Sequence, residues 1–157
     1  MVFYGLFLLH MATDEDGFPF THPVNLVLHE AGHPLFSWFG DTLGILGGTI
    51  LEILIPLLIA AYFFRQRHTA GVAFCLFWMF HTSSGIATYM ADARTVTLPL
   101  VGSGDHDWEI LFTQWGVLHL DRKIAGFVRV VGWLGMLGSV GWLTWMSLRQ
   151  RAAQEEK

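Results

Sequence analysis

The chain has 157 residues, a mean hydropathy of +0.46 and only 14% charged residues, which excludes an ordinary soluble domain. Its formal net charge is −4 and its nine Lys and Arg are scattered, which excludes a nucleic-acid-binding surface. Because Cys75 is the single cysteine, a disulfide framework and a cysteine-based metal site are excluded as well. We expect one all-α membrane domain over residues 1–157, with its seven Trp and thirteen Phe at interfaces and between helices.

The N-terminal segment, residues 1–23, is expected to begin as an interfacial helix and continue as a loop. Residues 1–12 are apolar, but they are too few for a helical span and lack the basic region and cleavage site of a signal peptide. Residues 13–23 are polar, contain Pro and Gly, and include three acidic residues but no Lys or Arg.

The helix expected next, over residues 24–39, contains the pattern His-Glu-Ala-Gly-His (HEAGH). His29 and His33 are separated by about 400° of helical rotation, so both imidazoles leave one face and can bind a single metal ion. Glu30 can then act as the general base that activates water at the metal, as in HExxH metalloproteases. Pro34 crowds the carbonyl one turn earlier and lacks an N–H, which predicts either an opening beside the metal or an early helix end.

Three further membrane helices are expected after residues 40–48, whose glycines predict a turn or a re-entrant loop. These helices cover residues 49–64, 69–90 and 124–148. A short amphipathic helix is expected over residues 108–118, with Asp107 as its N-cap. The sequence thus predicts a polytopic helical core over residues 24–148, with about four membrane helices, and a polar tail at 149–157.

The basic loop Arg65–His68 is the clearest topology signal, because positively charged loops face the cytoplasm. The helix after it brings Asp92 to the opposite side, and the loop that carries His106 stays there. The Lys-free loop before HEAGH is expected on that side too. We therefore expect a bacterial inner-membrane protein whose metal site faces the non-cytoplasmic side, although Arg122 and Lys123 run against this arrangement.

A catalytic zinc ion usually has three protein ligands and a water, so a third ligand is needed beside His29 and His33. His106 is the first choice, because it offers an imidazole on a loop at the expected membrane face. Asp92 is the second choice, because a carboxylate at a helix end can reach a site between helices.

Several other residues are weaker candidates for the metal site. Asp107 can bind a metal, but N-capping explains it. Glu52 lies in an apolar span and would be either a ligand or the hydrogen-bond partner of an imidazole N–H. His81 and the Thr and Ser after it form a polar patch that predicts hydrogen bonds between helices, a water path or support for the ligands. The remaining candidates are His22 and His119.

The HEAGH segment resembles that of intramembrane zinc metalloproteases of the site-2 protease class. The resemblance implies that His29 and His33 hold zinc and that Glu30 is catalytic. In that class the third ligand is an Asp of a later membrane helix, in an Asp-Gly motif. That motif is absent here, since the Asp-Gly of this chain, Asp16-Gly17, precedes HEAGH.

Over most of its length the chain is also similar to a group of small uncharacterised bacterial membrane proteins that contain HEAGH. The shared patterns are HEAGH-x-x-F, Leu-Gly-Gly, Tyr-x-x-Asp-Ala-Arg, Leu-Pro-Leu-x-Gly and His-Asp-Trp. They match residues 29–36, 46–48, 89–94, 98–102 and 106–108. This similarity favours Asp92 and His106 as ligands and implies no activity.

The sequence therefore predicts an integral membrane, zinc-dependent hydrolase, most simply a metallopeptidase that acts on a membrane-protein substrate. Its metal ligands would be His29, His33 and either His106 or Asp92. Glu30 would be its catalytic base. A metal-dependent oxidoreductase or lipid-modifying enzyme is a further possibility, but it would need more histidines in a cluster.

The alternative from another class is a small accessory or structural subunit of a larger membrane complex, with a structural metal site or none. Such a subunit would pack through glycines at three-residue spacing, which permit close approach to a helix of this chain or of a partner. These glycines are Gly132, Gly135, Gly138 and Gly141. Membrane lipids are expected partners in either case.

Overall fold

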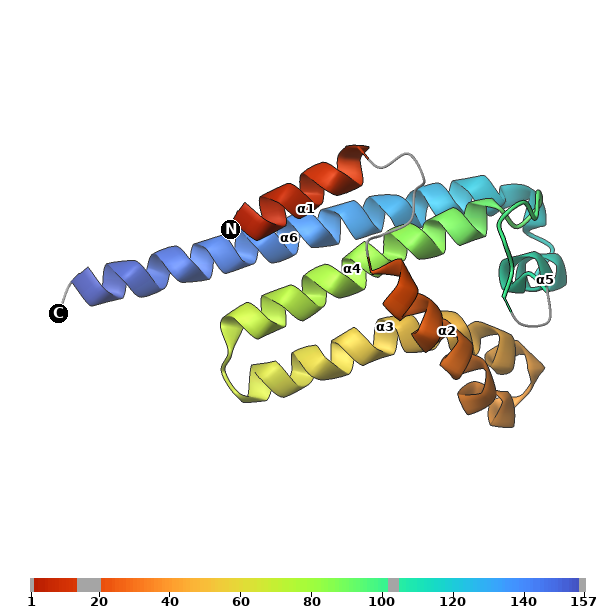
Figure 1. The fold of residues 1–157 in the computed structure, drawn as a ribbon, viewed down its shortest axis with the longest axis horizontal. Helices are drawn as coiled ribbons and strands as arrows, with labels where there is room; N and C mark the ends of the chain where they lie inside the picture. Colours follow the sequence, from red (N-terminus) through yellow and green to blue (C-terminus); the bar gives the residue numbers. More distant parts are fainter. Residues whose placement is uncertain (1, 14–20, 102–104, 156–157) are drawn as a thin grey trace.

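The computed structural model describes residues 2–13, 21–101 and 105–155, and the regular elements in them are all helices (Figure 1). The α-helices are α1 (Val2–Thr13), α2 (His22–Phe36), α3 (Asp41–Arg65), α4 (Thr69–Ala91), α5 (Asp107–Gln114) and α6 (Asp121–Glu155). Two 3-10 turns, η1 (Ser37–Phe39) and η2 (Leu118–Leu120), follow α2 and precede α6. The all-α prediction is confirmed for the described residues.

Three helices are long and apolar enough to cross a membrane: α3, α4 and the segment Leu118–Glu155, which contains α6. α2 has 15 residues and is therefore about 22 Å long. A span of the hydrocarbon core needs about 20 residues. The four spans expected from the sequence are therefore not confirmed, and α2 is the helix that falls short.

The glycine-rich residues 40–48 lead into and form the first turns of α3, which begins at Asp41 and not near residue 49. The predicted turn is limited to Gly40, whose φ is +105°, and the predicted re-entrant loop is wrong, because the later glycines lie within α3. A Cβ at Gly47 would lie 2.5 Å from the Gly32 carbonyl oxygen, and one at Gly32 would lie 2.1 Å from that of Gly47. Two backbones can approach this closely only where side chains are absent.

Other predicted boundaries shift by smaller amounts. α2 continues through Pro34 and ends at Phe36, where η1 takes over, so the helix ends early rather than at residue 39. α5 ends at Gln114 rather than at residue 118. α6 extends to Glu155, so most of the predicted polar tail is helical.

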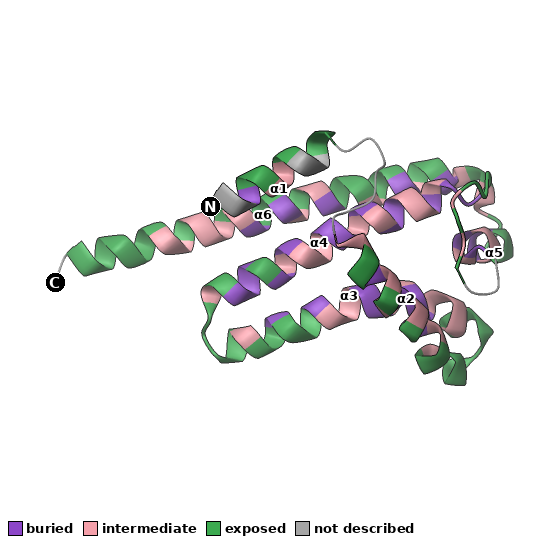
Figure 2. Ribbon diagram, viewed as in Figure 1, coloured by how far each residue is buried: buried purple, intermediate pink, exposed green. Residues whose placement is uncertain are grey.

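α4 is the central helix, because it packs against both α3 and α6 and has the largest buried share of the three candidate spans (Figures 1 and 2). α6 approaches α4 through Gly132 and Gly135. A Cβ at Gly132 would lie 2.9 Å from the Phe80 carbonyl oxygen, and one at Gly135 would lie 2.1 Å from the Phe80 ring. A Cβ added at Gly138 or Gly141 would meet nothing within 4 Å. Of the four glycines at three-residue spacing, the first two therefore pack against α4, and the last two face open space.

The N-terminal helix α1 lies along α4 and α6 (Figure 1). Tyr4 and Phe7 contact the Phe77 ring edge-to-face, with centroid distances of 5.1 and 5.6 Å. Tyr4 and Phe77 are buried in a cluster with Met136 of α6. The predicted N-terminal helix is present, and its place at a membrane interface stays a prediction.

The short helix α5 lies at the end of the bundle opposite the α3–α4 connection (Figure 1). Its side chains Trp108, Leu111 and Phe112 are buried in a cluster with Ile86 and Met90 of α4. Burying a large apolar side chain contributes roughly 1.5–3 kcal/mol, so three of them fix this short helix on the bundle. The first residue of α5 is thereby held in one place.

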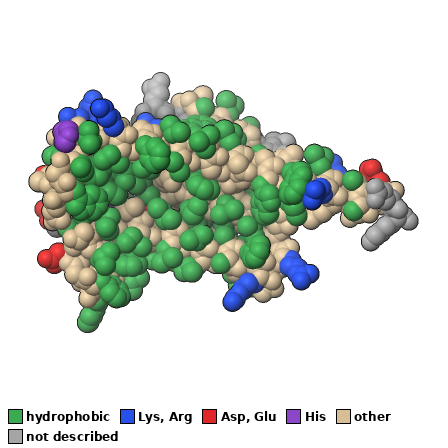
Figure 3. All heavy atoms as spheres, turned by 180° about the vertical axis from the view of Figure 1, so that it is seen from behind, with side chains coloured by type: hydrophobic (Ala, Val, Ile, Leu, Met, Phe, Trp, Pro, Cys, Tyr) green, Lys and Arg blue, Asp and Glu red, His purple; other side chains and the backbone are tan. Residues whose placement is uncertain are grey.

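The outer surface is apolar in the way expected of helices in lipid. Figure 3 shows a face on which hydrophobic side chains predominate, with Lys and Arg toward its edges. On α6, Phe127, Leu134 and Trp145 are 70%, 65% and 48% exposed. Soluble monomers rarely expose large contiguous apolar surfaces, so this surface agrees with a membrane protein.

Candidate metal centre

Two histidines of α2 and an aspartate of α5 converge at one end of the bundle. The His29 and His33 rings have centroids 4.8 Å apart, as the one-turn spacing predicts. Nε2 of His29 lies 2.8 Å and Nε2 of His33 lies 3.4 Å from Asp107 Oδ2. Among the described residues these three form a group whose ligand atoms all lie within 4.8 Å of one another. Two imidazoles and a carboxylate fit zinc, which binds such sets tetrahedrally with one position for water.

The second nitrogen of each imidazole is held by α3. Nδ1 of His29 lies 2.7 Å from Glu52 Oε1, and Nδ1 of His33 donates to the carbonyl oxygen of Gly44 at 2.9 Å. Since a carbonyl only accepts, Nδ1 of His33 carries a proton, and Nε2 is the nitrogen of this ring that faces Asp107. Glu52 takes one of the two roles predicted for it, as partner of an imidazole. Such contacts orient metal-binding histidines.

Gly48 of α3 makes room for the His29 ring. A Cβ at Gly48 would lie 2.6 Å from Cε1 of that ring and 2.7 Å from each nitrogen. Glu52 follows Gly48 by one helical turn and therefore faces the same ring. His29 and Glu52 are both buried, with 7% and 8% of their surface exposed. The glycine is thus required by the position of the imidazole and not by a turn of the backbone.

Asp107 is the first residue of α5, and the N-cap is His106. The N-cap prediction for Asp107 is therefore wrong. Nδ1 of His106 accepts a hydrogen bond from the Glu109 N–H at 3.2 Å, and the Asp107 N–H donates to the Tyr89 hydroxyl oxygen at 3.2 Å. Because the imidazole caps α5, the Asp107 carboxylate is left to face the two histidines of α2.

The predicted third ligands, His106 and Asp92, lie together beside this group and not in it. Nε2 of His106 is 3.7 Å from Asp92 Oδ2. Burial alone raises the pKa of Asp92, but hydrogen bonds from Thr95, Leu98 and Thr97 outweigh it and lower that pKa to about 2. Burial lowers the pKa of His106 below its ordinary value. Both side chains brace the loop around α5, and their assignment as zinc ligands stays a prediction.

A buried polar network ties the start of α2 to α4. The amide nitrogen of Asn25 donates to Thr82 Oγ1 at 3.0 Å, and its oxygen accepts from Trp78 Nε1 at 3.1 Å. Thr21 Oγ1 lies 3.1 Å from Nδ1 of His81. The patch around His81 thus provides hydrogen bonds between helices, which is one of its predicted roles. Since Asn25 lies one turn before the first metal-site histidine, this network sets the rotation of α2.

A cavity of about 820 Å³ opens onto the metal centre. Its apolar lining includes Leu26, Ile45, Ile86 and Leu100. Its acidic lining residues are Glu30, Asp41, Glu52, Asp105 and Asp107. None of the described lining residues is Lys or Arg, and no Lys or Arg precedes Arg65 in the chain. Glu30 therefore lines a cavity that combines apolar walls with negative charge.

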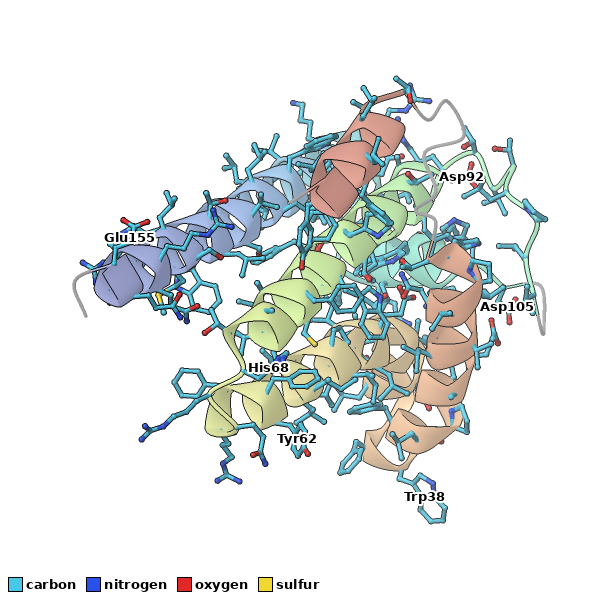
Figure 4. The ribbon with its side chains drawn as sticks, turned by 60° about the vertical axis from the view of Figure 1, so that its left-hand side comes forward. Trp38, Tyr62, His68, Asp92, Asp105 and Glu155 are labelled. Carbon is cyan, nitrogen blue, oxygen red and sulfur yellow. The ribbon has the colours of Figure 1, made fainter. Side chains whose placement is uncertain are left out.

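The metal centre lies at the acidic end of the molecule. Figure 4 shows Asp92 and Asp105 at this end, with His68 and Tyr62 at the other. Burial lowers the pKa of His29, but hydrogen bonds to Asp107 and Glu52 outweigh it and raise that pKa to about 9. The carboxylates that favour a proton on this imidazole also favour a metal cation, which competes with the proton.

Comparison with known proteins found no matching family model, no similar curated protein and no similar solved structure. The resemblances to site-2 proteases and to HEAGH-containing bacterial membrane proteins therefore stay hypotheses. The function of the site has to follow from its donor atoms, its charge and its cavity.

The sequence alone assigns no role to Gly48 and Tyr89, and it ranks Asp107 only among the weaker metal-ligand candidates. Gly48 and Tyr89 belong to the Leu-Gly-Gly and Tyr-x-x-Asp-Ala-Arg patterns, yet neither residue type suggests a metal site. Asp107 belongs to His-Asp-Trp, where the histidine is the more familiar ligand. The sequence signal for these residues is that short polar patterns recur in an otherwise apolar chain. This indicates a shared site but does not tell which residues of the patterns bind a metal.

Proposed function

We propose that this protein is a membrane-embedded, zinc-dependent hydrolase, most simply a metallopeptidase. The observation that carries the proposal is the approach of His29 Nε2 and His33 Nε2 to Asp107 Oδ2. Three protein ligands leave a zinc coordination position for water, as in catalytic sites, whereas structural zinc sites usually have four. Asp107 is therefore proposed as the third ligand.

The surrounding residues suit hydrolysis of an amide. Bound zinc supplies Lewis acidity, which acidifies water and polarises a carbonyl group. Glu30 lines the same cavity, so its carboxylate can accept a proton from the attacking water and return it to the leaving amine. Glu52 and the Gly44 carbonyl hold the two imidazoles in their orientations throughout.

The charge of the cavity supports a carbonyl substrate over a phosphate ester. Proteins bind phosphate groups mainly with Arg, Lys and backbone N–H groups, and the described lining residues include neither Arg nor Lys. Carboxylates such as Asp41 and Asp105 repel a phosphate. The apolar walls suit the side chains of a membrane-embedded peptide segment.

The proposal is tested by metal content and turnover in the purified full chain. We expect about one zinc per chain, lost in His29→Ala and retained in His119→Ala, which removes an exposed histidine outside the centre. Glu30→Gln should retain zinc but lose hydrolysis of a fluorogenic peptide with apolar residues around the scissile bond, by at least about 100-fold.

Two results would reject this function. One is the absence of stoichiometric metal from the wild-type protein. The other is full peptide hydrolysis by zinc-loaded Glu30→Gln. Retention of zinc in both histidine variants would show that the metal lies elsewhere.

The alternative, an accessory subunit with a structural metal site, draws its support from α6. A Cβ at Gly138 or Gly141 would meet nothing within 4 Å, and Leu137, which directly precedes Gly138, is 52% exposed. A partner helix can approach there. This function predicts that zinc stabilises the fold while Glu30→Gln has no effect on any measured property.

A further inference from the structure

Tyr89 of α4 lies in the wall of the cavity, between the metal-site histidine and the cap of α5. Its ring centroid is 5.9 Å from that of His29 and 4.1 Å from that of His106. Its hydroxyl oxygen accepts the N–H of Asp107 at 3.2 Å. The hydroxyl is therefore placed beside the residue whose carboxylate we propose as the third zinc ligand.

A phenolic hydroxyl is both an acceptor and a donor of hydrogen bonds. In the described part of the chain, the hydrogen bond made by the Tyr89 hydroxyl uses it as the acceptor. The donated hydrogen is then available to a group in the cavity that Tyr89 lines. The accepted hydrogen bond matters as well, because it fixes the position of the hydroxyl oxygen.

We propose that Tyr89 is a catalytic residue that donates a hydrogen bond to the substrate carbonyl oxygen as negative charge develops on it. This inference rests on the proposed hydrolase function. As Glu30 takes a proton from water, the water oxygen bonds to the carbonyl carbon and the C=O π electrons move onto the oxygen. The phenol keeps its proton throughout. When the C–N bond breaks, an electron pair of the oxyanion re-forms the C=O bond, and the C–N pair goes to nitrogen, which receives the proton from Glu30.

Other donors line the cavity, but the Asn25 amide nitrogen donates to Thr21 and Thr82, and the Ser37 hydroxyl donates to the Pro34 carbonyl oxygen. Developing oxyanions are stabilised by preorganised N–H or O–H groups or by cations. The described lining residues include no Lys or Arg, and the acidic side chains that line the cavity are acceptors when ionised. Tyr89 offers an O–H group that is fixed by a hydrogen bond to the backbone beside the metal centre.

The test uses zinc-loaded full-length protein in detergent and a phosphinic dipeptide with two leucine side chains. Its anionic tetrahedral group imitates the charged carbonyl oxygen, and the matching leucyl-leucine amide serves as the uncharged reference. We expect Tyr89→Phe to weaken phosphinate binding by roughly 10- to 100-fold, with much less effect on the amide and on zinc affinity. Tyr62→Phe is the matched control, because Tyr62 is 60% exposed at the far end of α3.

A second variant separates catalysis from positioning. O-methyltyrosine at position 89 keeps an oxygen that accepts the Asp107 N–H but removes the donated hydrogen. We expect it to keep zinc and to lose phosphinate affinity as Tyr89→Phe does. If Tyr89→Phe fails to fold, the O-methyltyrosine variant alone tests whether the Tyr89 hydroxyl donates a hydrogen bond.

Three outcomes would overturn the role of Tyr89 while leaving the hydrolase function intact. Both variants could bind the phosphinate as tightly as the wild type. The phosphinate affinity of Tyr89→Phe could fall only in proportion to its zinc content. Alternatively, O-methyltyrosine could bind the phosphinate as tightly as the wild type. Either result would make Tyr89 a positioning residue for Asp107. If the wild type binds no zinc, the proposed function and this inference both fail.

Discussion

His29 is oriented by contacts from two other parts of the chain. Glu52, which is 23 residues away, binds its Nδ1 atom, and Asp107, which is 78 residues away, contacts its Nε2 atom. Gly48 provides the space for the ring. The ring therefore presents Nε2 to the cavity only when α2, α3 and α5 are packed together. The candidate metal centre is a property of the assembled bundle, even though its two histidines lie one turn apart on one helix.

Asp92 gives a pH-dependent prediction at the scale of one residue. Its folded-state pKa of about 2 is below the ordinary value of 3.8, so the ionised carboxylate stabilises the fold above about pH 4. That contribution is lost as the pH falls through 2. We expect Asp92→Asn to lower the free energy of unfolding by about 2 kcal/mol at neutral pH, with the difference narrowing between pH 4 and 2.

Denaturation in detergent, monitored by tryptophan fluorescence at several pH values, measures this difference. Glu155→Gln is the control, since that carboxylate is exposed at the end of α6 (Figure 4). A destabilisation by Asp92→Asn that stays constant from pH 7 to pH 2 would contradict the prediction. It would mean that the shape of the side chain, and not its charge, holds the loop before α5.

At the scale of helices, the crossing of α2 and α3 decides whether the site forms. Gly32 and Gly47 face each other so closely that a Cβ on either would enter the backbone of the other helix. This contact places the α2 histidines over Glu52 and Gly44. α5 then supplies Asp107 from the opposite side, because its buried face is fixed on α4.

The crossing predicts opposite effects for the same substitution at two helical glycines. Gly47→Ala should lower the melting temperature and weaken zinc binding, because its Cβ would lie 2.5 Å from a backbone oxygen that cannot move aside. Gly138→Ala should be neutral or stabilising by up to about 1 kcal/mol, because its Cβ meets nothing and alanine favours the helix. Thermal unfolding and zinc titration of both variants check this. Equal effects would rule out the close crossing.

At the scale of the whole molecule, charge is distributed unevenly between the two ends of the bundle. Arg65 and Arg67 lie at the α3–α4 connection, away from the metal centre and from Asp105 (Figures 1 and 4). α6 ends with Arg149 and Arg151 on that same side. By the positive-inside rule we propose that this end faces the cytoplasm of a bacterial inner membrane and that the metal centre faces away from it.

Cysteine labelling of intact cells tests this orientation. In a Cys75→Ala background, a membrane-impermeant maleimide should label Gln114→Cys, at the end of α5, and should leave Gln66→Cys, beside Arg65, unlabelled. Both should react after the cells are permeabilised, which controls for accessibility. The reverse pattern would place the metal centre on the cytoplasmic side and would give weight to Arg122 and Lys123 as topology signals.

Features that depend on local spacing and composition were predictable from the amino-acid sequence. Long apolar runs without alternating polar residues favour helices, which satisfy their own backbone hydrogen bonds in lipid, and this made the all-α class predictable. The i and i+4 positions of His29 and His33 place them on one helical face. A carboxylate in an apolar span, Glu52, is costly unless it has a partner, and it contacts His29.

Which distant residue lies beside the two histidines depends on how the helices pack. His106 and Asp107 are neighbours in the chain, and the sequence favoured the imidazole. The packing of α5 on α4 uses that imidazole as a cap and turns the carboxylate toward the histidines. The glycines near residue 47 likewise suggested a turn, and their role at a helix crossing followed from contacts across the fold. Spacing along one helix is a local property, whereas the direction of a side chain between helices depends on how they pack.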